Sequence, residues 1–172
     1  MDVREALDQY LFVGQEFLTW LWFLGETRQQ VVLESGEEVL LMLGDRLALG
    51  PAQGQEGVRV AVRGQEASLA EAREALRRGK LVEAMRLHLE INGEEFAASL
   101  RAADLGLSAL RLPPTAPGED GVEGLFLERI ALIDTLLGVI EGLLRMFLRQ
   151  RLDAGQGPAL LAAMKAWAAG PE

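Results

Sequence analysis

The side chains best suited to chemistry are few in this sequence, because it contains one histidine and no cysteine. A nucleophilic enzyme needs a base, most often a histidine, beside its serine or cysteine nucleophile. The histidine, His88, lies among alternating apolar residues and shares the polar face of a predicted strand with Arg86 and Glu90. We therefore interpret His88 as a solvated strand residue rather than a catalytic base or a metal ligand.

Three pairs of adjacent carboxylates are the remaining candidates for acid–base catalysis or metal binding. They are Glu37-Glu38, Glu94-Glu95 and Glu119-Asp120. Each pair lies in a predicted turn or loop, without the apolar surroundings that would separate its two pKa values. We expect no catalytic residue, no cofactor and no metal, with a structural cation at one of these pairs as the alternative.

Length and composition indicate one folded globular domain over residues 1–172. The chain has 49% apolar and 25% charged residues, the balance of a protein that buries a core. Its net charge of −9 disfavours DNA binding by the whole surface, because an acidic protein repels phosphate. A nucleic-acid function would need a local basic patch or a basic partner.

Two apolar stretches, 10–24 and 125–148, are long enough to be compared with membrane spans. The first is short and contains Gln15 and Glu16, and the second contains five charged residues. Charges at that density are too costly in a bilayer core. The N-terminus also lacks the basic region of a secretory signal. We expect a cytoplasmic protein that does not enter a membrane.

Hydrophobic periodicity predicts an α+β fold in which helices pack on an antiparallel β-meander sheet. Asp2 can cap a long N-terminal helix that runs to about Leu24 and ends at Gly25. Apolar residues then alternate between residues 29 and 64, as expected for a meander with one face in water. The alternating runs are 31–33, 39–43, 47–49 and 58–62.

A short helix and a hairpin follow the meander. A capping box formed by Ser68 and Glu71 predicts a helix over residues 69–78. Residues 81–91 alternate, Asn92-Gly93 is a strong hairpin turn signal, and the return strand covers residues 95–101.

The last part of the chain is predicted to be mostly helical. A short strand over 107–112 is followed by a proline- and glycine-containing loop over 113–121. A long apolar helix then runs from about Val122 to Leu152, and Pro158 suits the first turn of a final helix that ends near Ala169.

Basic residues gather on the predicted polar faces of the strands and at the end of the short helix. The two groups are Arg59, Arg63, Arg86 and Arg101 on strands, and Arg73, Arg77, Arg78 and Lys80 at the helix end. A local basic surface is therefore conceivable, and we expect Arg59, Arg63, Arg77, Arg78 and Lys80 to lie together in it. The alternative is that these are solvated faces, with the helix-end cations complementing the helix dipole.

Two apolar features indicate a core and an interface. The aromatic stripe Phe17, Trp20, Trp22 and Phe23 lacks interleaved basic residues, so it favours core or subunit contact over base stacking. The helix over 122–152 is apolar nearly all round, more than a lone domain of this size can easily cover. We expect a homodimer or partner interface on it, formed by Leu136, Ile140, Leu143, Leu144 and Phe147.

Three stretches, taken in order, resemble the recombination-associated RdgC family. They are residues 14–23 (GQEFLTWLWF), residues 76–82 (LRRGKLV) with the hairpin that follows, and residues 140–144 (IEGLL) within the apolar helix. The resemblance covers nearly the whole chain but only the C-terminal half of a typical family member.

Membership of this family would imply a non-enzymatic, sequence-independent DNA-binding protein of the nucleoid. Such proteins form ring-like homodimers on duplex DNA and restrain the strand-exchange recombinase. The resemblance also implies that a separate protein carrying the N-terminal half is a candidate partner.

Two hypotheses of different classes therefore stand at this point. The first is a dimeric DNA-associated module that contacts double-stranded DNA through Arg59, Arg63, Arg77, Arg78, Lys80, Arg86 and Arg101. The second is a protein–protein assembly module without DNA binding, which is favoured by the net charge and the apolar C-terminal helix.

Overall fold

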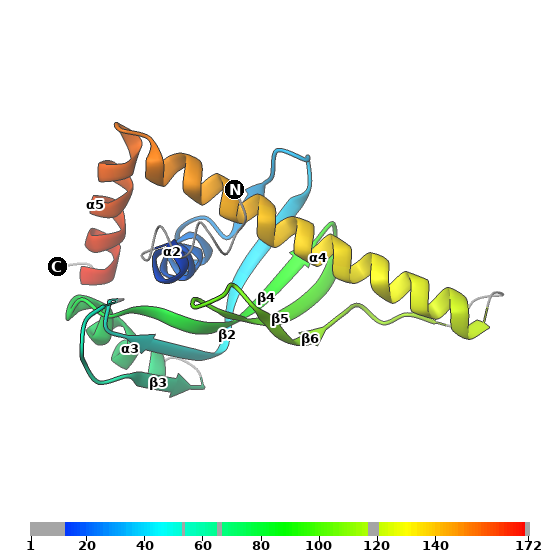
Figure 1. Ribbon diagram of the computed structural model, residues 1–172, viewed down its shortest axis with the longest axis horizontal. Helices are drawn as coiled ribbons and strands as arrows, with labels where there is room; N and C mark the ends of the chain where they lie inside the picture. The colour runs from blue at the N-terminus through cyan, green and yellow to red at the C-terminus, as the bar shows by residue number, and fades with distance from the viewer. Residues whose placement is uncertain (1–12, 53, 65–66, 117–120, 171–172) are drawn as a thin grey trace.

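The computed structural model describes residues 13–52, 54–64, 67–116 and 121–170, and within these ranges the fold is α+β (Figure 1). Its six strands form one antiparallel sheet in the order β1-β2-β4-β5-β6. Strand β1 pairs with residues 38–40 of β2, and β3 pairs with residues 46–49 of β2. The strands are β1 Gln30–Val32, β2 Glu38–Gly50, β3 Val60–Arg63, β4 Leu81–Ile91, β5 Glu94–Arg101 and β6 Leu107–Arg111. The antiparallel sheet predicted from alternating apolar residues is confirmed.

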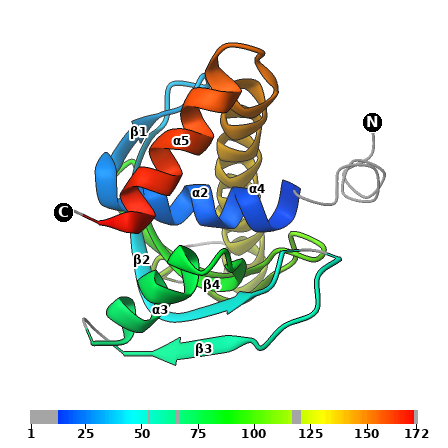
Figure 2. The ribbon, with the colours of Figure 1, turned by 90° about the vertical axis from the view of Figure 1, so that its left-hand side faces the viewer.

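The four helices in the described ranges are α2 Val13–Thr27, α3 Ala67–Arg77, α4 Gly121–Leu152 and α5 Gln156–Ala169. In Figure 2 α3 lies directly above β3, and α2 and α5 lie above α3. The apolar side chains of the strands point toward them, with Val39, Leu41 and Leu49 on β2 and Leu87 and Leu89 on β4 at most 1% exposed. The sheet therefore has one face covered by helices and one that these helices leave open.

Helix α2 is the centre of the core. Phe17, Trp20 and Trp22 are at most 1% exposed, and the rings of Phe17 and Trp20 each lie 5.6 Å from the ring of Phe147 on α4. The predicted aromatic stripe is thus core. The predicted start of this helix at Asp2 falls on residues 1–12, which lie outside the described residues.

The main departure from the predicted strands is that residues 39–43 and 47–49 belong to one continuous strand. The register of β2 against β4 shifts between Leu43 and Leu47, so the chain passes Gly44 and Asp45 as a bulge. A Cβ atom at position 44 would lie 2.6 Å from Cγ of Arg86, so only glycine lets the Arg86 side chain cross the bulge. Gly44 and Asp45, which predicted a break between two strands, instead form a bulge within one strand.

The other element bounds agree closely with the prediction. Helix α3 begins two residues before the predicted Leu69, α4 begins at Gly121, and β3 begins at Val60, leaving Val58 77% exposed. Asn92 and Gly93 have φ of 51° and 84°, the two positive values that a tight hairpin turn of this type requires. None of the helices in the described ranges is long and apolar enough to cross a membrane.

The junction between α4 and α5 is held by Asp153. Its Oδ1 atom accepts hydrogen bonds from the backbone N–H groups of Gln156 (2.8 Å) and Gly155 (2.9 Å). These two bonds, with Gln156 as the larger cause, hold the pKa of Asp153 below its ordinary value of 3.8. The charged carboxylate therefore caps the amino end of α5.

We predict that Asp153→Ala lowers the thermal midpoint of the protein, whereas Asp153→Asn, which keeps an acceptor oxygen, lowers it less. The folded-state pKa is depressed, so the ionic contribution is complete above pH 3.8 and is lost as pH falls through the folded pKa. The difference in midpoint between wild type and Asp153→Ala should be constant near neutral pH and shrink below pH 3.8, measured by circular dichroism. A difference that grows on acidification would contradict this assignment.

Candidate interaction surfaces

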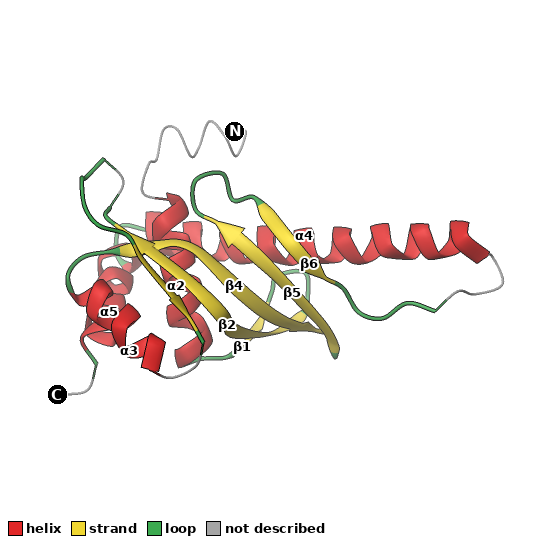
Figure 3. Cartoon of the chain, turned by 90° about the horizontal axis from the view of Figure 1, so that it is seen from below, coloured by secondary structure: helices red, strands yellow, loops and turns green. Residues whose placement is uncertain are grey.

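The face of the sheet opposite the helices is the first candidate surface. Figure 3 looks onto this face, and the strands pass in front of α2 and α4. Cross-strand pairing places small, charged and apolar side chains on it. This open face comprises Leu40, Met42, Arg46, Ala48, Ala61, Arg63, Ala84, Arg86, His88, Glu90, Glu95, Ala97, Ser99 and Arg101.

Arg46 and Arg63 are the most unusual pair on the open face. They are direct partners across β2 and β3, and both are exposed. No carboxylate pairs with either among the ion pairs of the described residues. Like charges directly opposite each other in a sheet are destabilising. With Arg86 they line a shallow depression of about 200 Å³ whose floor includes alanines of β2, β3 and β4.

Arg86 has a structural role on the same face. Its guanidinium donates hydrogen bonds to Oγ of Ser99 (3.3 Å) and to the carbonyl oxygen of Ala109. Ala109 has φ of 49°, a conformation that costs a non-glycine residue energy and lies where β6 shifts register against β5. Arg86 therefore stabilises the irregular backbone of β6 as well as contributing charge.

Most of the other arginines predicted to form the basic surface lie beside acids. Arg59 pairs with Glu83 (2.8 Å), Arg101 with Asp104 (2.7 Å), and Arg77 and Arg78 both pair with Glu74 of their own helix. Such pairs neutralise the local positive potential.

The expected grouping of Arg59, Arg63, Arg77, Arg78 and Lys80 is also divided by the fold. Arg77 donates to the carbonyl oxygen of Ala168 on the helical side of the molecule, whereas Arg63 belongs to the open face. Lys80 is half-buried just after α3. Arg46 was not a predicted site residue, although its place one residue before the apolar Leu47 put it on the polar face.

The amino-terminal half of α4 is the second candidate surface, and we call residues 121–137 the arm. It extends past the strands of its own chain (Figure 1). Its large apolar side chains are exposed to solvent: Val122 84%, Phe126 63%, Leu127 60%, Ile130 40% and Leu137 47%. An apolar surface of this kind on a projecting element is typical of a contact site.

The residues predicted for the interface begin at Leu136, near the end of the arm, and the other four lie further along the same helix. Leu136, Leu143 and Phe147 are fully buried within the chain, and Ile140 is 7% exposed, while Leu144 is half-buried. Helix α2 and the covered sheet face fill the space around these side chains. The apolar surface open to a partner is therefore formed by the exposed residues of the arm and not by the predicted residues.

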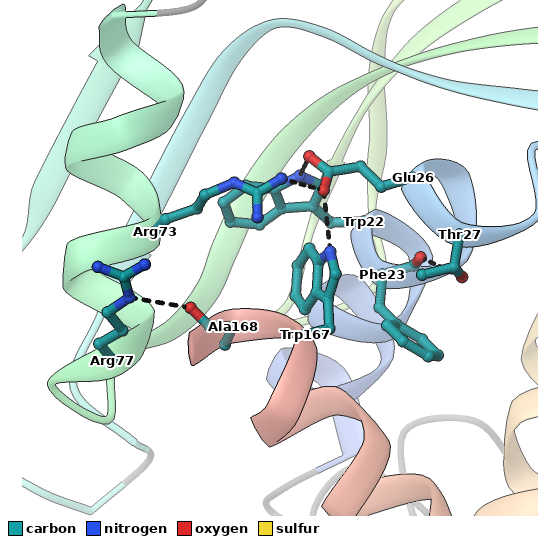
Figure 4. A network of polar contacts seen from close by, with 8 residues as sticks. All are labelled: Trp22, Phe23, Glu26, Thr27, Arg73, Arg77, Trp167 and Ala168. Carbon is teal, nitrogen blue, oxygen red and sulfur yellow. Dashed lines mark hydrogen bonds and ion pairs between the residues drawn. The ribbon is translucent and has the colours of Figure 1, made fainter. Parts of the chain in front are cut away.

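Glu26 is the centre of a cluster of polar contacts that joins three helices. Glu26 on α2 accepts hydrogen bonds from the indole N–H groups of Trp22 (2.7 Å) and Trp167 (2.9 Å) and pairs with Arg73 on α3 (Figure 4). Arg73 also lies 5.7 Å from the centre of the Trp167 ring. This cluster joins α2, α3 and α5, and it uses the carboxylate oxygens of Glu26 as acceptors.

Among the described residues, His88 and the carboxylates belong to no cluster of ligating side chains. His88 stands opposite Met42 on β2 and Ala97 on β5. Within the described ranges, no group of three histidine, aspartate or glutamate side chains lies close enough to hold a metal ion. Of the predicted carboxylate pairs, Glu119-Asp120 lies outside the described residues.

We predict that Glu26→Ala lowers the free energy of unfolding by about 1–3 kcal/mol, because it leaves Arg73 and two indole N–H groups without their acceptor. The matched control is Glu141→Ala, which breaks an exposed pair with Arg145 on α4 and should cost less than about 0.5 kcal/mol. Urea unfolding of the two variants measures both values. Equal effects would show that the Glu26 cluster contributes no more than a surface ion pair.

Comparison with known proteins leaves the family relationship open. No protein-family model, curated protein or solved structure significantly matches this chain.

Proposed function

We propose that this chain is a non-enzymatic assembly module that self-associates through the arm of α4. The observation that carries the proposal is the row of exposed apolar residues on a helix that extends beyond its own domain. The row supports a contact that forms between molecules, because the described part of the chain does not cover it.

The spacing of the row supports packing against another surface along one side of the helix. Val122, Phe126, Ile130, Ile133 and Leu137 are separated by four, four, three and four residues. Residues three and four apart lie on one face of an α-helix, so these side chains form one stripe. Burying a side chain of this size contributes about 1.5–3 kcal/mol, which is enough for a few residues to stabilise a dimer.

The charge of the arm supports the same proposal. Glu123, Glu128 and Asp134 flank the stripe, and no ion pair of the described residues involves them. Charged flanks beside an apolar stripe are the usual composition of an interface rim. The arm thus has the apolar centre and polar border of a contact surface.

We predict that Phe126→Ser/Ile130→Ser weakens self-association at least about 100-fold, because two apolar side chains are lost from each copy. Leu152→Ser is the matched control, since Leu152 is 58% exposed on the same helix but outside the arm. Sedimentation velocity over a concentration series measures both variants against wild type, whose monomer mass is 18.8 kDa. An unchanged dissociation constant in the arm variant would refute the proposal.

A second candidate function is sequence-independent binding of duplex DNA, as the resemblance to RdgC proteins implies. The observation that favours it is the unpaired Arg46 and Arg63 on the open face. The net charge of −9 and the ion pairs of Arg59, Arg77 and Arg78 act against it.

Fluorescence anisotropy with a labelled duplex across a salt series tests this second candidate. DNA binding through phosphates would weaken steeply with salt, and Arg46→Glu/Arg63→Glu would reduce both the affinity and the salt slope. If the wild type shows no binding at low salt, DNA binding by this chain is excluded.

A further inference from the structure

The open face has small side chains at a position where a helix could pack. Its central residues across β2, β3 and β4 are Ala48, Ala61 and Ala84, which are direct cross-strand neighbours. Small side chains in the middle of a sheet face leave room for large side chains of a packed helix. Met42, which is 43% exposed, adds apolar surface to the same face.

The charged residues that line the depression on this face are arginines, and Glu90 and Glu95 lie toward the other end of the face. Arg46 and Arg63 face each other with no carboxylate partner in the described ranges, and Arg86 lines the same depression. No acidic side chain lines that depression. A ligand that covers it must therefore supply negative charge to relieve the repulsion between the arginines.

The arm has the complementary properties. Residues 121–137 contain three acids, Glu123, Glu128 and Asp134, and one arginine, Arg129, so the arm carries a net charge of −3 + 1 = −2. Its large apolar side chains match the small residues of the open face. Two arms packed on each other would instead gather a charge of −4 at one contact.

The arm cannot occupy the open face of its own chain. The second half of α4 is fixed on the other side of the sheet, where Phe147 packs against Phe17 and Trp20 of α2. Because α4 is one continuous helix of 32 residues, the arm continues away from the sheet in that direction. The arm of a second molecule has no such restriction.

We infer that the arm of one copy docks on the open face of a second copy, and that a twofold axis makes the exchange reciprocal. This inference rests on the proposed self-association and names the surface that receives the arm. Each dimer then contains two identical arm-to-face contacts, and both uncovered surfaces are buried together. The acids of the arm neutralise Arg46 and Arg63, and the apolar stripe covers the alanine floor.

Charge exchange between two variants tests the inference. The face variant is Arg46→Glu/Arg63→Glu, and the arm variant is Glu123→Lys/Glu128→Lys/Asp134→Lys. Each variant alone places like charges at both contacts, so each should self-associate at least about 10-fold more weakly than wild type. In an equimolar mixture, the basic arm meets the acidic face and the acidic arm meets the basic face, so heterodimers should form with near wild-type affinity.

The control for the net charge of the face variant is Arg28→Glu/Lys165→Glu. It makes the same charge change as the face variant, at two exposed residues away from the open face. It should leave the dissociation constant within about 2-fold of the wild-type value. Sedimentation velocity measures every sample, and native mass spectrometry identifies heterodimers in the mixture.

Three outcomes would overturn the inference, and they separate it from the proposed function. A face variant that dimerises like wild type, while Phe126→Ser/Ile130→Ser does not, would keep self-association and reject the open face as its seat. A face variant that loses only DNA binding would assign the arginines to DNA instead. Dimers that persist both in Phe126→Ser/Ile130→Ser and in Glu123→Lys/Glu128→Lys/Asp134→Lys would reject the proposed function itself.

Discussion

The fold depends on one constraint, which is that the described helices cover only one face of the sheet. Strands β2, β4 and β5 send most of their large apolar side chains to a single side, where α2 fills the centre of the core. The other side carries mainly alanine, serine and charged residues, which need no apolar cover from their own chain, together with Leu40 and Met42. A one-sided sheet of this kind leaves a broad surface for contact with another molecule.

The same constraint explains why α4 is divided into two halves of different character. Leu136, Leu143 and Phe147 are buried in the core. The core does not extend to most of the preceding turns of the helix, so the exposed side chains of those turns have no cover from the described part of the chain. Their exposed apolar residues nevertheless keep the helical spacing of a packed stripe. The arm and the open face are thus both surfaces that the core of the described part of the chain does not cover.

Sequence reasoning predicted the elements that local signals define. Alternation identified the strands, Asn92-Gly93 identified the hairpin, and the aromatic residues of α2 were correctly assigned to contact rather than to base stacking. These signals are local because each depends on a few neighbouring residues.

The parts that sequence reasoning missed depend on contacts between distant residues. Position 44 must be glycine because the side chain of Arg86 from another strand lies against it, and the partner of Arg59 is Glu83, which lies at a register shift of β4 against β2. Neither pairing is visible in the spacing of residues. The apolar residues all round α4 indicated an interface, but only the packing of α2 decides which half of the helix remains uncovered.

The central claim is that the two uncovered surfaces of this chain cover each other between copies. The chain has no cysteine, so single thiols can be placed on each surface without competing sites. Ile130→Cys in the arm and Ala61→Cys on the open face are mixed in equal amounts and treated with a short thiol-specific cross-linker. The account predicts cross-linked pairs that contain one copy of each variant, with few pairs in either variant alone. Efficient cross-linking of Ile130→Cys to itself, or none in the mixture, would contradict the account.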